Sequence, residues 1–195
     1  MAFVEIRAAT PQDATILARL HVAAWRETYA TLLPAEVARL DPARRRERWR
    51  AILEAEISGR AGGAATQLLL ADGLPAGFVT AGPQRHPPLA EMGYDGEIRA
   101  LYLLRRWQGQ GFGRRLIGAG AVTLARLGAW AASAQVLASN QPAGAFYAHL
   151  GARLVARLGG GARAEATWAW EDLQVLLPDA LRQGAVPPYG GNAPG

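Results

Sequence analysis

The sequence predicts an α/β fold (α+β by some schemes) built on a single mixed sheet with a central parallel β-α-β pair. Strand-like and helix-like periodicities alternate along the chain. Two pairs of strand-like segments are joined by hairpin-type turns, at Asp72-Gly73 and at the glycine run 159–161. One helical segment connects two further strand-like segments, which implies that those two strands run parallel.

The N-terminal half begins with an alternating strand at 3–8. Thr10 and Pro11 then supply an N-cap and a first-turn residue for a helix. The buried stripe of this helix contains Ile16, Leu17 and Leu20. The elements expected next are a helical stretch from Leu32 to residue 58 that breaks at Asp41-Pro42, a loop at 59–65, strands at 66–71 and 75–82, and an irregular loop at 83–96.

The segment EIRALYLL at 97–104 is the clearest strand in the chain. The elements expected after it are a helix at 114–128, a buried strand at 129–139, a short helix at 142–151 and a hairpin formed by 153–158 and 166–173. Residues 178–195 are rich in proline and glycine, which predicts a flexible C-terminal tail. Residues 1–177 are then expected to form one domain.

Composition excludes several kinds of protein. Half of the 195 residues are hydrophobic and 19% are charged, as in a folded globular domain. No apolar run reaches the roughly 20 residues that span a bilayer, and the N-terminus lacks the layout of a signal peptide. We therefore expect a cytoplasmic protein that does not contact membranes. The absence of cysteine excludes disulfides and a cysteine nucleophile, and three scattered histidines predict no metal site.

All 21 basic residues are arginine, and the formal net charge is +5. Codon bias explains the lack of lysine. The densest basic run, RRRERWR at 44–50, contains Glu47 and is typical of a solvated helix face. We expect no nucleic-acid partner. The alternative, an arginine-rich nucleic-acid-binding protein, predicts a steep loss of DNA affinity with salt.

The segment RRWQGQGFGRR at 105–115 predicts a phosphate-binding loop. It lies at the carboxyl end of the strand 97–104 and leads into a helix, where consecutive backbone N–H groups form an anion site. A tight turn with solvated arginines is the alternative. A Walker A loop requires a lysine that the chain lacks, and the dinucleotide motif requires glycine where Arg114 stands.

This loop resembles the acyl-CoA loop of the GNAT superfamily of N-acetyltransferases. The stretch Gln108–Gly113 satisfies the family pattern Gln/Arg-x-x-Gly-x-Gly/Ala. The family pattern N-x-x-A-x-x-F-Y follows, with Asn140 and Tyr147 at its ends. The resemblance covers residues 3–174 in the correct order. The sequence departs from the family at Arg105, where proline is common, and at Ala152, where phenylalanine commonly follows glycine.

The resemblance implies a mostly antiparallel sheet with helices on both faces, whose central parallel pair is splayed to hold acetyl-CoA. The cofactor-binding residues that it implies are Leu101, Tyr102, Leu103, Gln108, Gly109, Gln110, Gly111, Phe112, Gly113, Arg114 and Asn140. Further candidates for the phosphate oxygens are Arg105, Arg106 and Arg115. No metal is implied.

The resemblance also implies two catalytic residues. Tyr147 matches the family tyrosine that protonates the sulfur of CoA, and a phenol can donate to a thiolate at modest cost. Glu97 matches the position of a general base in several family members, and we expect it to act through a water. Weaker candidates for the base are Asp95, Glu91 and Glu27. Trp25 and Tyr29 lie where the family builds one wall of its acceptor pocket.

The implied function is transfer of the acetyl group of acetyl-CoA to a primary amine of a small molecule or a protein. Direct attack in a ternary complex is expected. A non-catalytic acyl-CoA sensor on the same fold is the alternative, although the presence of both Glu97 and Tyr147 favours an enzyme. The expected partner is then an amine acceptor. Dimers are common in the family, so the resemblance also allows a homodimer. Fold alone does not select the acceptor.

Overall fold

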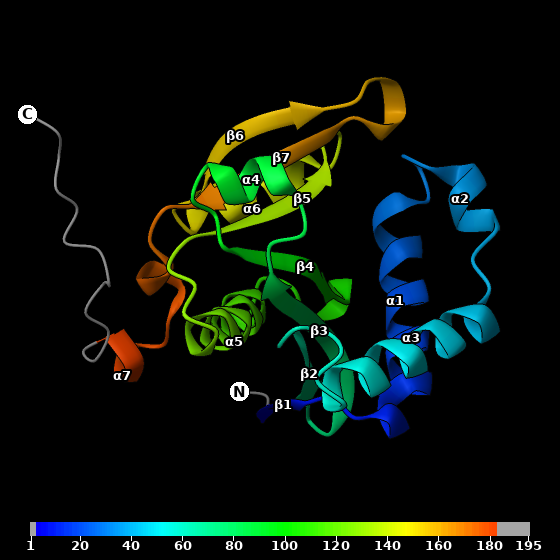
Figure 1. The fold of residues 1–195 in the computed structure, drawn as a ribbon. Coiled ribbons are helices and arrows are strands. Elements are labelled where there is room, and N and C mark those ends of the chain that lie inside the picture. The colour runs from blue at the N-terminus through cyan, green and yellow to red at the C-terminus, as the bar shows by residue number, and fades with distance from the viewer. Residues whose placement is uncertain (1–2, 183–195) are drawn as a thin grey trace, which may run out of the picture.

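The protein is described by a computed structural model over residues 3–182. Seven strands make one sheet: β1 (Val4–Ala8), β2 (Ala65–Ala71), β3 (Leu74–Pro83), β4 (Gly96–Leu103), β5 (Ala132–Leu137), β6 (Arg153–Leu158) and β7 (Glu165–Trp170). The helices are α1 (Ala14–Tyr29), α2 (Pro34–Ala38), α3 (Pro42–Ile57), α4 (Pro87–Glu91), α5 (Phe112–Arg126), α6 (Gln141–His149) and α7 (Asp179–Arg182). Figure 1 shows their arrangement.

The strand order in the sheet is β1-β2-β3-β4-β5-β7-β6. Only β4 and β5 are parallel, and α5 crosses over between them. Every other neighbouring pair is antiparallel. The predicted mixed, mostly antiparallel sheet with a central parallel β-α-β pair is therefore confirmed.

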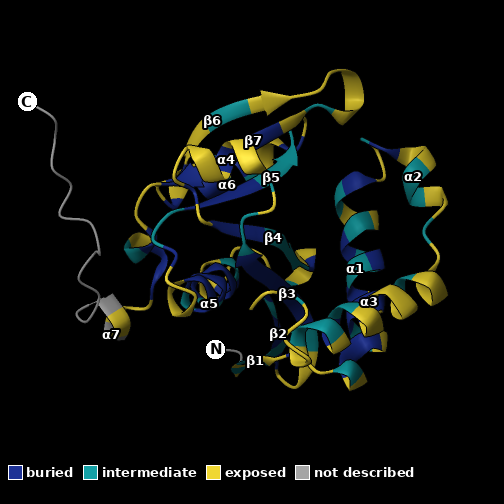
Figure 2. Cartoon of the chain, viewed as in Figure 1, coloured by how far each residue is buried: buried dark blue, intermediate teal, exposed yellow. Residues whose placement is uncertain are grey.

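Helices cover both faces of the sheet, as expected. On one face α1 and α3 enclose an apolar cluster with Leu68 and Phe78, whereas on the other α5 packs on Val79 and Ile98. Figure 1 shows α1 and α3 on one side of β3 and α5 on the opposite side. The outward face of α3, which carries the arginine run, is exposed (Figure 2). This confirms that the basic run lies on a solvated helix face.

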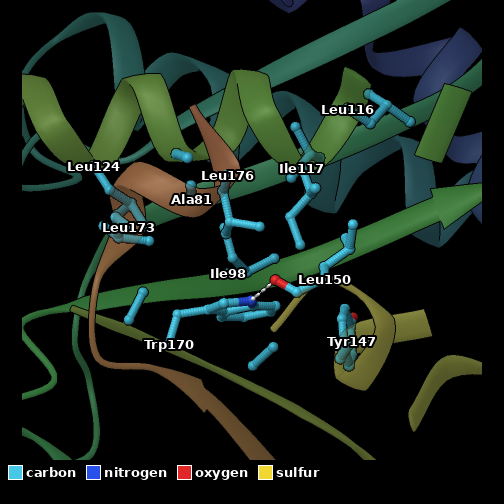
Figure 3. Packing of buried hydrophobic residues seen from close by; sticks show 14 of the residues in the cluster. Ala81, Ile98, Leu116, Ile117, Leu124, Tyr147, Leu150, Trp170, Leu173 and Leu176 are labelled. Atoms are coloured by element: carbon cyan, nitrogen blue, oxygen red, sulfur yellow. Dashed lines mark hydrogen bonds between the residues drawn. The ribbon is translucent and has the colours of Figure 1, made fainter. Parts of the chain in front are cut away.

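The C-terminal part of the fold closes the core beneath α5. The indole N–H of Trp170 donates to the carbonyl oxygen of Leu150 at 3.0 Å, which ties β7 to the end of α6 (Figure 3). Tyr147 meets the Trp170 ring edge-on, with 5.5 Å between the ring centroids. Leu173 and Leu176, just after β7, complete the same cluster. The ring of Tyr147 is therefore held by packing as well as by its helix.

The turn between β2 and β3 has the conformation that the sequence predicts. Asp72 and Gly73 have φ values of 50° and 74°, so both adopt the left-handed region that a two-residue hairpin turn with a right-handed twist requires. The Asp72 carboxylate also accepts a hydrogen bond from the Phe3 N–H at 2.8 Å. The turn thereby fixes the register of β1 as well as that of β3.

Three sequence expectations need correction. Residues 83–96 are not wholly irregular, because Pro87 and Pro88 begin the short helix α4, where a missing N–H costs nothing. The strand expected at 129–139 is only Ala132–Leu137, since the Ala129 N–H still bonds to the Leu124 carbonyl at the end of α5 and a turn follows at Leu137. The helix expected at 114–128 begins at Phe112, because Gly111 caps it.

The C-terminal segment is partly described. Residues 179–182 form α7, and residues 183–195 of the expected tail lie outside the described residues. None of the helices within 3–182 has the length and apolar character of a membrane span. Within the same range, no cluster of three or more histidine, aspartate or glutamate side chains could hold a metal ion.

The N-terminal cap contains a partly buried ion pair, in which Asp13 is buried and Arg7 is partly exposed. The Asp13 carboxylate accepts hydrogen bonds from both terminal nitrogens of Arg7 at 2.8 Å, and from the N–H and hydroxyl of Thr10. The hydrogen bond from Arg7 lowers the pKa of Asp13 to about 2, against the opposing effect of burial. The expected helix start at Thr10 is confirmed, and it is also the point at which β1 is tied to α1.

This ion pair predicts a loss of stability in Asp13→Asn. We expect the variant to lower the free energy of unfolding by about 1–2 kcal/mol at pH 7, because the native state favours the ionised carboxylate. A depressed folded pKa stabilises only above the unfolded pKa, so the difference should shrink as the pH falls from about 4 to about 2. Urea unfolding across that range measures it. The exposed Asp95→Asn serves as control and should change stability by less than about 0.5 kcal/mol.

Candidate active site

A cleft opens where the two parallel strands separate. Pairing between β4 and β5 is limited to three positions, the last of which is Ile98 opposite Ala134. Both strands continue beyond this point, and a cavity of about 940 Å³ lies between them. Its lining comes from β4, β5, α6, the end of α1 and the glycine loop. The splayed pair of parallel strands that the family resemblance implied is therefore present.

A β-bulge in β4 marks the point of separation. Thr80 pairs with Ala100 and Ala81 with Ile98, so Arg99 is the extra residue. A bulge bends its strand and increases the twist, which turns the end of β4 away from β5. Arg99 therefore stands at the apex of the opening.

The antiparallel pairing of β3 with β4 also directs backbone N–H groups of β4 into the cleft. The N–H of Leu104 donates to the carbonyl oxygen of Ala76 at 2.9 Å. In an antiparallel pair, successive residues alternate between facing the partner and facing away. The N–H groups of Leu103 and Leu101 must then point away from β3, toward the cleft that both residues line. The Gln108 side chain donates to the Leu103 carbonyl at 3.0 Å and so caps this end of the strand.

The glycine loop presents a run of unpaired peptide N–H groups. Gln108 donates to Arg105, and the next backbone donor with a carbonyl partner within residues 3–182 is Arg115, which donates to Gly111 at 3.2 Å. The six N–H groups from Gly109 to Arg114 are left for a ligand. Gly109 and Gly111 have φ values of 73° and 80°, a left-handed backbone conformation that residues with a side chain rarely adopt.

The space around these two glycines is open. A Cβ built at Gly109 or at Gly111 would meet no heavy atom within 4 Å, so the glycines are required by conformation and not by crowding. Gly111 caps α5 in the left-handed conformation, and the positive end of the helix dipole therefore faces the same space. The loop can hold an anion by its backbone alone.

The arginines around the loop have different surroundings. Arg114 is exposed and lines the cleft. Arg105 donates its N–H to the Glu27 carboxylate and its side chain to the Glu27 carbonyl, both at 2.7 Å. Arg106 lies over the Trp107 ring, and Arg115 reaches a carbonyl of β1. Of the four arginines, Arg114 is the one that lines the cleft without a partner for its guanidinium among residues 3–182.

Tyr147 and Asn140 come to the cleft from α6. Asn140 caps the helix, accepting a hydrogen bond from the Ala143 N–H at 3.3 Å, and its amide donates to the Tyr29 hydroxyl at 3.4 Å. Tyr147 is 6% exposed. Burial, and then the neighbouring Tyr102 and Tyr29, raise the pKa of Tyr147 above its usual value of 10. Its hydroxyl therefore stays protonated across the physiological pH range.

Glu97 is buried beside the cleft and not in its lining. Its two carboxylate oxygens accept hydrogen bonds from the Arg85 guanidinium at 2.7 and 2.8 Å. Arg99 and His86 lie 3.8 and 4.0 Å from the same carboxylate. The sequence did not indicate this pairing, because Arg85 lies in the segment expected to be irregular.

Two aromatic residues from α1 approach the cleft. The Trp25 indole donates to the Tyr102 hydroxyl at 2.9 Å, and the Trp25 and Tyr29 rings are 4.8 Å apart. Tyr29 lines the cleft, whereas Trp25 is half-buried behind it. Burial raises the pKa of both Tyr29 and Tyr102 above 10. Trp25 thus orients Tyr102 and does not itself face the cavity.

Most of the predicted site residues converge on this cavity. Those that line it are Tyr29, Leu101, Tyr102, Leu103, Gln108, Gly109, Gly111, Gly113, Arg114, Asn140 and Tyr147. Phe112, the first residue of α5, has its side chain in the buried core, and the Gln110 side chain donates to the Arg106 carbonyl. The sequence reasoning missed Arg99 and Gln135, which also line the cavity. The signal for Gln135 was a long polar side chain within a buried strand of otherwise small or apolar residues.

Comparison with known proteins agrees with this geometry. Residues 19–152 match the family model described as the acetyltransferase (GNAT) family. This chain belongs to the GNAT family. YuaI of Bacillus subtilis, an uncharacterized N-acetyltransferase, is 30% identical to this GNAT protein over 181 residues, which are 89% of the chain and 96% of YuaI.

Solved GNAT structures share the fold of this acetyltransferase family member. PaiA N-acetyltransferase of Thermoplasma acidophilum, solved with coenzyme A, superposes with a TM-score of 0.66 at 17% identity, covering 85% of this chain and 98% of PaiA. YncA of Salmonella typhimurium, solved with its cofactor acetyl-CoA, gives 0.62 at 18% identity and covers 87% and 94%. An N-acetyltransferase of Staphylococcus aureus gives 0.65 at 18% identity, covering 88% and 99%.

Proposed function

We propose that this GNAT protein transfers the acetyl group of acetyl-CoA to a primary amine by direct attack. The run of six unpaired peptide N–H groups from Gly109 to Arg114 carries the proposal. A diphosphate offers oxygens and negative charge to such a run, and the left-handed glycines let it approach without a Cβ in the way. Relatives of the same fold that were solved with coenzyme A or acetyl-CoA support the choice.

Acetyl-CoA supplies the acetyl group as a thioester, and the residues around the cleft suit that chemistry. The Leu103 N–H, which points away from β3, is placed to donate to the thioester carbonyl oxygen as negative charge develops there. Leu101 and Leu103 give the pantetheine arm an edge of unpaired peptide groups. The Asn140 amide offers a further polar contact at the start of α6.

Tyr147 is proposed as the acid that protonates the departing sulfur. Its hydroxyl lines the cleft, and no acceptor for its proton occurs among residues 3–182. Because burial keeps the phenol protonated, the proton is available at the moment the thiolate leaves.

Glu97 is proposed as the base that accepts the proton of the amine, through a water. A relay is required because the carboxylate is engaged with Arg85 and lies outside the cavity lining. The same pairing also anchors the corner between β3 and β4 beside the point where β4 and β5 separate.

The variant Glu97→Gln distinguishes the role of Glu97 as a base from its role as an anchor between β3 and β4. We expect kcat to fall by about 100-fold, most at low pH where free amine is scarce. Arg85→Gln is the matched control, since it breaks the same ion pair but keeps the carboxylate. A pH–rate profile of kcat for both variants makes the comparison. Identical losses and identical profiles would assign Glu97 to anchoring alone.

The direct test of the proposed function is amine-dependent release of thiol from acetyl-CoA. We expect the purified protein to show this activity with at least one primary amine. Binding of acetyl-CoA without thiol release across a broad amine library would support the acyl-CoA sensor instead. A protein whose melting temperature is unchanged by acetyl-CoA would contradict both.

A further inference from the structure

The part of the cleft next to α1 is rich in hydrogen-bond donors. The Tyr29 hydroxyl accepts from Asn140 and the Tyr102 hydroxyl accepts from Trp25. A hydroxyl that accepts one bond still has its own proton to donate. Within the described chain, nothing accepts the proton of either phenol, and both side chains line the cavity. Burial favours the protonated form of both groups.

Two further donors lie just beyond the last parallel pair. Gln135 follows Ala134 on β5, and Arg99 follows Ile98 on β4, so both residues stand where the opening begins. The Gln135 side-chain nitrogen and the Arg99 Nε are buried and have no hydrogen-bond partner in residues 3–182, whereas the Arg99 Nη2 donates to the Pro83 carbonyl oxygen at 2.7 Å. The Glu97 carboxylate is 3.8 Å from Arg99 Nε. Leaving a buried donor without a partner is unfavourable, and a bound acceptor atom would relieve that cost.

The charged residues around the cavity also favour an anionic group over a cationic one. The described residues that line it include three arginines, Arg99, Arg105 and Arg114, and a single acidic residue, Glu27. One oxygen of Glu27 is already occupied by the Arg105 N–H at 2.7 Å. Glu97, behind the lining, is held by Arg85. A substrate with a second ammonium group would therefore find cations, whereas a carboxylate would find donors and positive charge.

Resting on the proposed transferase activity, we infer that the acceptor is an amino carboxylate: a small primary amine with a carboxylate near its amino group. Tyr29, Tyr102 and Gln135 donate to the carboxylate oxygens, and Arg99 supplies the compensating charge. The amino group then lies in the part of the cavity that Leu103 and Tyr147 line.

Matched acceptors test this inference. Alanine, alaninamide and 1,2-diaminopropane form one set, and 4-aminobutanoate, 4-aminobutanamide and 1,4-diaminobutane form a longer one. We expect kcat/KM for thiol release to be at least about tenfold higher for the carboxylate than for the diamine in one or both sets. Higher activity with the amide than with the carboxylate would show that hydrogen bonding without charge recognises the acceptor, and would overturn the inference.

Two variants link the preference to these residues. Gln135→Leu and Tyr29→Phe should each raise KM for the amino carboxylate by about tenfold and leave the thermal shift with acetyl-CoA in place. Acetyl-CoA binding combined with a preference for diamines, or with no turnover of amino carboxylates, would overturn this inference but not cofactor binding. Absence of any acetyl-CoA binding would overturn the proposed function together with it.

Discussion

Gly111→Val is expected to weaken acetyl-CoA binding by at least about 100-fold, equivalent to about 2.7 kcal/mol. Gly111 caps α5 with φ at 80°, in the middle of the run of unpaired N–H groups. A β-branched residue avoids this conformation, so valine would rotate the peptide groups on either side of it. Its side chain would also occupy the open space through which the diphosphate approaches. Titration calorimetry with acetyl-CoA measures the loss.

Gly128→Val is the matched control for backbone strain. Gly128 has φ at 79°, has no neighbour within 4 Å of a built Cβ, and stands at the opposite end of α5. Both variants should lose a similar stability, about 1–3 kcal/mol. Only Gly111→Val should lose cofactor affinity. If Gly128→Val weakened acetyl-CoA binding to the same extent, general destabilisation would explain the effect and the loop would have no special role.

Tyr147→Phe is expected to lower kcat by about 10²- to 10⁴-fold and to change the acetyl-CoA affinity by less than about threefold. The variant removes one hydroxyl and keeps the edge-on contact with Trp170, so packing is preserved. Because burial raises the pKa of Tyr147 above 10, this group should cause no fall in the wild-type rate up to that pH. Stopped-flow thiol detection and calorimetry give the two quantities.

Tyr94→Phe is the control for loss of a buried tyrosine hydroxyl. Tyr94 is 7% exposed, packs with Leu89 and Ala169, and lies outside the cavity lining. Its loss should leave kcat within about twofold. Equal losses of rate and cofactor affinity in Tyr147→Phe would assign that residue to packing rather than to proton transfer.

The cofactor half of this site could be predicted from the sequence because it depends on local signals. A strand, a glycine loop and a helix follow one another within about thirty residues, and a crossover of this kind fixes the parallel pair. The conformations of Gly109 and Gly111 follow from the same segment. Gln110 and Phe112 stand at positions that the family pattern leaves unspecified; the Gln110 side chain bonds to the Arg106 carbonyl and the Phe112 side chain is buried, so the loop presents its backbone and not these side chains.

Apart from Tyr29, the acceptor half could not be predicted, because a single residue inverts the side-chain pattern of β4. Without the bulge at Arg99, alternation would place Ile98 and Tyr102 on the same face of the sheet. With it, Ile98 packs toward α5, and Tyr102 faces α1 with Ala100. The pairing of Glu97 with Arg85 is likewise a long-range contact that no local pattern encodes.

A crystal structure of the protein with coenzyme A tests the central claim most directly. We predict that diphosphate oxygens lie within about 3.2 Å of several backbone nitrogens between Gly109 and Arg114, with the sulfur near the Tyr147 hydroxyl. Coenzyme A held only by arginine side chains outside the splayed strands, with those backbone nitrogens left to water, would contradict the account.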